Sequence, residues 1–352
     1  MNIPSGRILS GRALSTAAAL ALTGFAALPT AADAQSVEQF YKGKTVNVYI
    51  GFTPGGTYDI FGRMVARYIG KYIPGQPTVV AQNMPGAGSF KAANFVYAVA
   101  PKDGTALGIV SQTVALEEAL GTPGVQYKSA ELNWVGRATS NIEVQLTWMT
   151  SKTKTMQDAL TNETPVASTG PGSPSEGYPR LLNGLIGTKF KIIGGYPGST
   201  DGLLAMERGE VDGALTSWNT VKVSRADWLR EKKINILVQY TIERSPEIPD
   251  VPTFVELGKT DEDKKILAFY VSGGEIGRSF FTTPGVPKER VAALRKAFSD
   301  MVKDPDLLAD IDHMKADFIP LDGEKLQKLI EDTAKVSPAI IAKMQTHLRA
   351  GQ

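Results

Sequence analysis

The chain has 352 residues, and its 38 Lys and Arg against 36 Asp and Glu give a formal net charge of only +2. A charge so close to neutral excludes the basic footprint of proteins that bind nucleic acid or anionic membranes. The chain contains no cysteine, which excludes disulfides, thiolate metal sites and cysteine nucleophiles, while the length suffices for two packed domains.

Residues 1–34 have the pattern of a secretory signal peptide. Arg7 and Arg12 supply the positive flank, an Ala- and Leu-rich run follows at 13–28, and the sequence Ala32-Asp33-Ala34 has the small residues that signal peptidase needs. A membrane anchor is the alternative, but the run is shorter than the roughly 20 apolar residues of a spanning helix. We therefore expect cleavage after Ala34 and a soluble, unanchored protein in the periplasm.

Beyond the signal, short β-branched runs alternate with amphipathic stretches, which is typical of an α/β fold with largely parallel sheets. Residues 45–50 predict a strand, and residues 59–72 predict a helix because their apolar side chains recur at helical spacing. The same reasoning predicts strands at 78–81, 105–110, 166–169, 211–215 and 234–238, helices beginning at 89 and 200, and two or three polar-faced helices within 287–348.

The predicted elements group into two lobes. The segment 142–149 and the proline-rich segment 245–252 are expected to cross between them. We therefore predict a discontinuous first lobe, residues 35–141 and 266–352, that is interrupted by a second lobe at 142–265. Two α/β lobes joined by more than one crossing can hinge about a cleft, and ligands of such sheets bind beyond the carboxyl ends of the strands.

Turns rich in glycine and proline follow predicted strands at 52–59, 85–89 and 170–175. Glycine lets backbone N–H groups approach a ligand without a Cβ in the way, and the helix that follows contributes unpaired donors and a partial positive charge. One such turn is usually only structural. Their recurrence favours a cleft that binds a carboxylate without Arg or Lys.

Four longer motifs stand in order along the chain. They are Phe52-Thr53-Pro54-Gly55-Gly56-Thr57-Tyr58-Asp59, Asn83-Met84-Pro85-Gly86-Ala87-Gly88, Ala100-Pro101-Lys102-Asp103-Gly104-Thr105 and Arg244-Ser245-Pro246-Glu247-Ile248-Pro249-Asp250-Val251-Pro252-Thr253. They resemble the motifs of the substrate-binding receptors of tripartite tricarboxylate transporters, the Bug family, although the third has one residue inserted. Weaker matches at 168–173, 196–199 and 283–287 extend the similarity from about Tyr41 to the C-terminus.

The resemblance implies a two-lobed periplasmic binding protein fold of type II, in which each lobe is a mostly parallel sheet flanked by helices. A carboxylate would lie in the cleft between the lobes, held by backbone amides and bridging waters. The ligand-binding residues expected from the loops and the resemblance are Phe52, Pro54, Gly55, Gly56, Thr57, Asp59, Gly86, Ala87, Gly88, Ser111, Thr169, Gly170, Gly172, Ser173, Tyr196, Gly198, Ser217 and Trp218.

Some of these residues also have structural explanations. Asp59 is equally suited to stabilise the first turn of its helix, where Arg63 would pair with it at i,i+4 spacing. Aromatic residues beside a strand end are more often core, and the resemblance alone places Tyr196 and Trp218 in the cleft. Glu176 would repel an anion, so we expect it to point away from the ligand or to cap its own helix.

The chain departs from the family where the distal end of a ligand would lie. Ser173-Pro174-Ser175-Glu176-Gly177 stands in place of Ser-Thr-Ser-His, and Thr216-Ser217-Trp218-Asn219 stands in place of Phe-Asp-Asn. Loss of that Asp argues against an amino-acid ligand, while Trp218 offers a flat apolar wall. We predict a small mono- or dicarboxylate, with aromatic carboxylates among the candidates.

Competing functions have less support. His313 and His347 are the only histidines, both lie in the charged C-terminal region, and neither a nucleotide-binding motif nor a complete nucleophile elbow occurs. A hydrolase is therefore disfavoured, and we expect no catalytic residue, no cofactor and no metal. We expect a monomer that binds no nucleic acid and passes its ligand to the membrane subunits of a tripartite transporter. A receptor that docks on a membrane sensor kinase is the alternative.

Overall fold

The computed structural model describes residue 1, residues 35–333, residue 335 and residues 337–351. The expected signal peptide and its cleavage after Ala34 lie outside the described residues. The described residues from Ser36 onward form one compact unit. In this described part of the chain, no helix combines the length and apolarity that crossing a bilayer requires.

The first sheet combines strands from the N-terminal third of the chain with strands that return much later. Within the described residues its order is β11 (Leu321–Asp322), β4 (Asn133–Arg137), β10 (Ser279–Thr282), β3 (Ala106–Ile109), β1 (Thr45–Ile50) and β2 (Thr78–Asn83). β1 pairs in parallel with β2 and β3, whereas β10 is antiparallel to both β3 and β4. The predicted strands at 45–50, 78–81 and 105–110 are thus confirmed.

Alternation of side chains along β1 decides which helices cover each face of this sheet. Val46, Val48 and Ile50 point to one face, and Tyr49 points to the other. The first face packs against α1 (Val37–Tyr41), α2 (Thr57–Ile69), α11 (Lys288–Met301) and α12 (Pro305–Met314). The second packs against α3 (Phe90–Ala98), α4 (Val114–Ala119) and α13 (Gly323–Thr333).

The second sheet repeats this arrangement. Its order within the described residues is β7 (Phe190–Ile193), β6 (Thr164–Ala167), β8 (Gly213–Ser217), β5 (Glu143–Trp148) and β9 (Ile234–Tyr240). β6 is parallel to β7 and β8, and β5 is antiparallel to β8 and β9. One core contains α5 (Met156–Ala159), α6 (Pro174–Ile186), α10 (Asp261–Val271) and α14 (Pro338–Ala350), and the other contains α7 (Ser199–Glu207), α8 (Trp218–Ser224) and α9 (Ala226–Arg230). Two sheets flanked by helices confirm the predicted α/β fold class. The expectation that each sheet is mostly parallel is wrong, because four strand pairings among the described residues are parallel and five are antiparallel.

Residues 138–142 and 272–278 connect the two sheets. The first segment leads from β4 to β5, the second leads from α10 to β10, and the two are hydrogen-bonded to each other. Arg278 N donates to Thr139 O at 2.9 Å, and Asn141 N donates to Gly274 O at 2.9 Å. A paired connection of this kind lets the lobes hinge there.

The crossings predicted at 142–149 and 245–252 are wrong. Residues 143–148 form β5 inside the second sheet, where both of its neighbours are antiparallel. The proline-rich segment folds back on β9, and Gln239 N donates to Pro252 O at 3.0 Å. The apolar run at 142–149 is therefore a buried strand and not a connection. The segments that do connect the sheets, 138–142 and 272–278, are short and polar.

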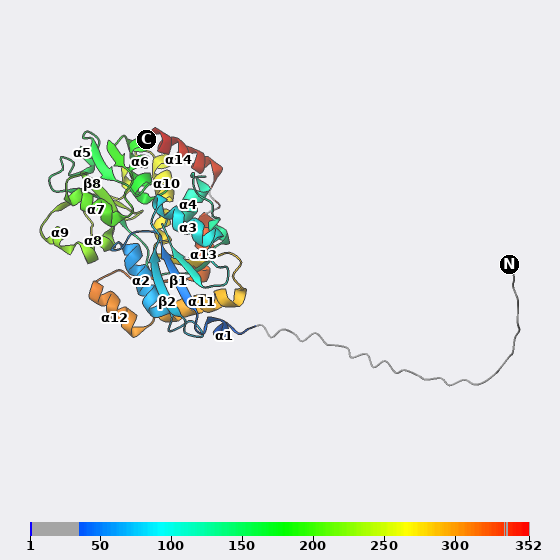
Figure 1. The fold of residues 1–352 in the computed structure, drawn as a ribbon. Coiled ribbons are helices and arrows are strands. Elements are labelled where there is room, and N and C mark those ends of the chain that lie inside the picture. The colour runs from blue at the N-terminus through cyan, green and yellow to red at the C-terminus, as the bar shows by residue number, and fades with distance from the viewer. Residues whose placement is uncertain (2–34, 334, 336, 352) are drawn as a thin grey trace. The chain divides into compact units, whose positions relative to one another are not determined.

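The C-terminal helix departs from the expected lobe assignment. The boundary put 266–352 in the first lobe, but α14 lies against α6 beside the second sheet (Figure 1), with Met344 fully buried there. Gly184 makes this close packing possible, because a Cβ on it would lie 2.0 Å from His347 O. The chain therefore crosses between the lobes once more before its end.

Replacing Gly184 with valine is expected to lower the free energy of unfolding by about 2 kcal/mol, because the new side chain overlaps backbone of α14 and forces the helices apart. Urea unfolding followed by circular dichroism measures the change. Gly194→Val is the matched control, since a Cβ at Gly194 has nothing within 4 Å. Equal stabilities for the two variants would contradict the close packing of α14 on α6.

Candidate ligand-binding site

A small cavity lies where residues of the two lobes meet. Its volume is about 40 Å³, which is room for about three water molecules. A solute the size of a carboxylic acid therefore enters only if the lobes separate. The lining residues are Phe52, Thr57, Tyr58, Glu143, Thr169, Pro174, Ser175, Ser199, Leu215, Thr216, Ser217, Thr220 and Arg278.

Three helices begin at this cavity. Thr57, Pro174 and Ser199 are the first residues of α2, α6 and α7, and all three line it. Within the described residues, no side chain caps any of these N-termini. Pro174 has no N–H, so the first donors of the three helices are the N–H groups of Thr57, Ser175 and Ser199. These donors and the positive ends of three helix dipoles make the cavity attractive to an anion.

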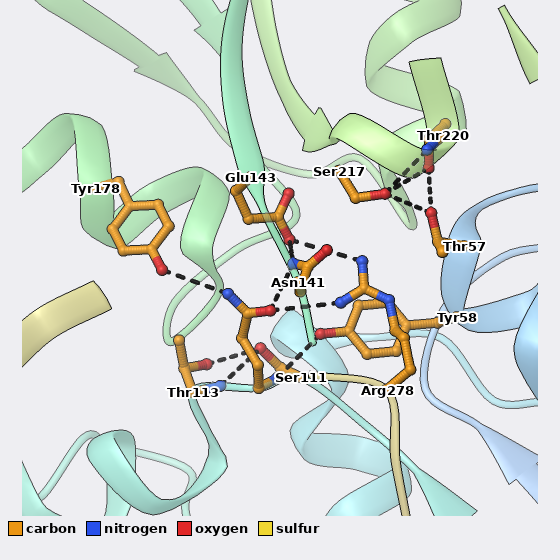
Figure 2. A network of polar contacts seen from close by, with 11 residues as sticks. Thr57, Tyr58, Ser111, Thr113, Asn141, Glu143, Tyr178, Ser217, Thr220 and Arg278 are labelled. Carbon is orange, nitrogen blue, oxygen red and sulfur yellow. Dashed lines mark hydrogen bonds and ion pairs between the residues drawn. The ribbon is translucent and has the colours of Figure 1, made fainter. Parts of the chain in front are cut away.

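Polar contacts join the lobes around the cavity. Thr57 Oγ1 of the first lobe is hydrogen-bonded to Ser217 Oγ and Thr220 Oγ1 of the second, as Figure 2 shows. The loops make three further contacts of this kind: Thr53 Oγ1 to Asp201 Oδ2 at 2.8 Å, Gly88 N to Thr169 O at 3.1 Å, and Thr113 Oγ1 to Gly172 O at 2.7 Å. The glycine loops thus lie at the contact between lobes.

Charged and amide side chains form a buried network beside the cavity (Figure 2). The guanidinium of Arg278 stacks on the ring of Tyr58, with Cζ 3.9 Å from the ring centroid. Its Nη2 lies 3.9 Å from Glu143 Oε1, and Asn141 Nδ2 donates to that same oxygen at 2.5 Å. Gln112 Oε1 accepts from Asn141 Nδ2 at 2.5 Å.

Burial changes the acidity of this network. Desolvation raises the pKa of the Glu143 carboxyl, while Arg278 and the hydrogen bond from Asn141 act in the opposite direction. Desolvation also raises the pKa of the Tyr58 hydroxyl, which stays neutral and accepts from Gln112 N at 3.0 Å. The neutral form of Glu143 is therefore favoured more than that of an exposed glutamate.

The structure brings part of the predicted site together. Phe52, Thr57, Thr169 and Ser217 line the cavity. The residues that immediately precede its helix N-termini or form the contacting loops are Pro54, Gly55, Gly56, Gly86, Ala87, Gly88, Gly170, Gly172, Ser173 and Gly198. Ser111 is buried next to them, where its N–H donates to Ser89 Oγ at 2.9 Å.

Three predicted residues lie off the cavity wall and have structural contacts of their own. Trp218 packs in the second-lobe core and donates its indole N–H to Glu247, and Tyr196 packs against the same core. Asp59 Oδ2 accepts from Gly55 N at 3.0 Å, and its Oδ1 accepts from Arg63 Nε at 2.9 Å. The predicted pair of Asp59 and Arg63 is confirmed, and it shapes the first glycine loop.

Glu176 is turned away from the cavity. Its carboxylate pairs with Arg180 Nη2 at 2.7 Å and accepts from Ser168 Oγ at 3.3 Å. The negative charge of Glu176 is thereby paired within its own helix at i,i+4 spacing. This confirms the expectation that it points elsewhere.

Sequence reasoning missed the charged pair at the cavity. Arg278 and Glu143 stand outside every glycine loop, and the expectation of a site without Arg or Lys overlooked the first of them. The signal for Arg278 was a lone basic residue next to the apolar strand 279–282. Glu143 also weakens the argument against amino-acid ligands, because it supplies a carboxylate at the cavity that the segment around Trp218 lacks.

No group of three or more His, Cys, Asp or Glu side chains that could hold a metal ion occurs in the described residues.

A model of the TctC family, described as the tripartite tricarboxylate transporter family receptor, matches residues 60–346. The chain belongs to the TctC family. The similarity to Bug receptors that the motifs indicated is confirmed.

Relatives of this TctC receptor agree over nearly the whole chain. The UPF0065 protein in gbd 5′ region of Cupriavidus necator is 27% identical over 348 residues, which cover 93% of this chain and 94% of that protein. The periplasmic binding protein BugD has a structure with a TM-score of 0.70 and 19% identity, covering 87% of this chain and 98% of that one. MatC from Rhodopseudomonas palustris with bound malate has a TM-score of 0.65 and 24% identity, covering 87% and 99%.

Proposed function

We propose that this TctC receptor is exported to the periplasm, binds a small mono- or dicarboxylate between its lobes, and delivers it to the membrane subunits of a tripartite transporter. The observation that carries the proposal is the convergence of three helix N-termini without side-chain caps on one cavity between the lobes. Such N-termini bind carboxylates through backbone N–H groups and the helix dipole. The malate bound by MatC is a ligand of this class.

The lobe arrangement supports capture by closure. The sheets are joined by the paired segments 138–142 and 272–278, and the cavity lies where the loops of both lobes meet. A solute that enters when the lobes separate is enclosed when Thr57 again contacts Ser217 and Thr220. Membrane subunits that recognise only the enclosed form can then distinguish a loaded receptor from an empty one. Nothing in this sequence of steps needs a catalytic residue.

A thermal-shift screen of the purified receptor tests the function. Because the ligand binds the folded protein alone, we expect a carboxylate to stabilise it by about 2.7 kcal/mol at ~100-fold excess over Kd. The panel holds aliphatic di- and tricarboxylates, aromatic carboxylates, amino acids, sugars and oligopeptides at one pH, with hits confirmed by calorimetry. A tight sugar or peptide hit without any carboxylate hit would show that the cavity is not an anion site.

A further inference from the structure

Arg278 is a buried cation at the ligand cavity whose hydrogen-bonding groups are left largely unused. The residue is 1% exposed. Among the described residues its guanidinium makes one hydrogen bond, from Nη1 to Gln112 Oε1 at the long distance of 3.4 Å, and its buried Nε has no partner. Burying a charged group without partners is strongly unfavourable. An unsatisfied cation in such a place indicates a partner that enters from outside.

Glu143 does not supply that partner. Its Oε1 lies 3.9 Å from Arg278 Nη2, beyond hydrogen-bond distance, and is held by Asn141 Nδ2. Burial also raises the pKa of Glu143, which favours its neutral form. A carboxyl at this distance leaves the N–H donors of the guanidinium unused. The guanidinium donors therefore remain available to an anion, and the N-termini of α2, α6 and α7 favour an anion in the same cavity.

Arg278 is held by contacts of both its backbone and its side chain. Its backbone belongs to the paired segments that connect the lobes, with N–H donating to Thr139 O at 2.9 Å and C=O accepting from Ala138 N at 2.9 Å. The ring of Tyr58 lies under the guanidinium, a cation–π contact that orients the planar group. A charge held at the hinge keeps its place when the lobes separate, so it can meet a ligand before closure.

We propose that Arg278 binds one carboxylate of the ligand while the uncapped helix N-termini bind a second, so that the preferred ligand is a dicarboxylate. This inference rests on the proposed function and narrows its ligand class. The guanidinium fork matches a carboxylate through two parallel N–H···O bonds. Thr216 Oγ1, another buried atom on the cavity wall without a hydrogen-bond partner among the described residues, can bond to a polar group between the two acidic ends.

Calorimetry on two isosteric variants tests this assignment. The probes are malate and the straight-chain dicarboxylates from malonate to azelate, each compared with its half-amide. We expect the wild type to bind at least one dicarboxylate on the order of 100-fold more tightly than its half-amide. Arg278→Gln should lose about that factor for the dicarboxylate and bind both forms alike. Glu143→Gln, which removes the opposing carboxyl, should bind the dicarboxylate more tightly than the wild type.

The two variants are expected to change the affinity for the dicarboxylate in opposite directions. Damage to the shared network would instead weaken binding in both variants, so the pair distinguishes ligand binding by Arg278 from a structural role. Circular dichroism and thermal unfolding without ligand report folding, and Arg278→Gln/Glu143→Gln provides a charge-balanced protein if the first variant is unstable. Wild-type affinity for the dicarboxylate in Arg278→Gln, or in the double variant, would overturn the inference. So would unchanged or weaker binding of the dicarboxylate in Glu143→Gln.

The outcome also distinguishes the inference from the proposed function. If the wild type binds some carboxylate but no dicarboxylate, the function stands and the inference fails. An α-amino acid as preferred ligand, lost in Glu143→Gln, would likewise overturn the inference and assign Glu143 to an ammonium group. If no carboxylate of any class binds, the proposed function fails and the inference fails with it.

Discussion

Replacing Gly198 with valine is expected to weaken ligand binding by at least ~100-fold while leaving the fold intact. Gly198 precedes α7 with φ −158, an extended conformation that any residue adopts. The three nearest atoms to a Cβ built on it all belong to Thr53 of the other lobe, and Thr53 Oγ1 would be only 2.0 Å away. The clash exists only when the lobes are in contact, so the variant should fold and fail to close.

Calorimetry measures the affinity, and small-angle X-ray scattering with and without ligand measures closure. Gly194→Val lies in the same loop and has open space around its Cβ, so it should keep the affinity and compaction of the wild type. Normal closure and affinity in Gly198→Val would mean that the ligand-bound lobes do not approach each other at Thr53.

Replacing Glu117 with glutamine should make the protein more stable than the wild type at pH 8, by about 2–3 kcal/mol more than at pH 5. Glu117 is 3% exposed, and burial raises the pKa of its carboxyl to about 7, with Glu176 adding to the rise and Thr122 and Arg180 opposing it. Between the unfolded pKa of 4.5 and the folded pKa of about 7, the Glu117 carboxyl is therefore protonated in the folded state and ionised in the unfolded state. Glu117 contributes stability below the unfolded pKa of 4.5, and this contribution is lost as pH rises through about 7.

Glutamine cannot titrate, so the variant lacks this loss while keeping a group that Thr122 Oγ1 can donate to. Urea unfolding of both proteins at pH 5 and pH 8 gives the difference directly, because other titrating groups cancel between them. A stability difference that is the same at both pH values would show that Glu117 is already ionised in the folded protein at pH 5.

Several features could be predicted from local patterns. The apolar runs of β1, β2 and β3 predicted strands, and the glycine turns at 52–59 and 170–175 marked the places where α2 and α6 begin. The pairing of Asp59 with Arg63 followed from helical spacing alone. Strands β4, β7, β10 and β11 were not predicted, because they are short and their neighbours along the chain give no alternation that separates a strand from a loop.

The sequence by itself determined the family, the α/β class and the glycine loops that meet between the lobes, because turn chemistry and hydrophobic periodicity are local properties. Only the tertiary structure decided that α14 packs on α6 and that the crossings are 138–142 and 272–278. It alone placed Arg278 beside Tyr58 and Glu143. These three residues lie far apart in the chain and come together because the apolar faces of the sheets are buried. The sequence around each residue carries no local pattern that would predict this contact.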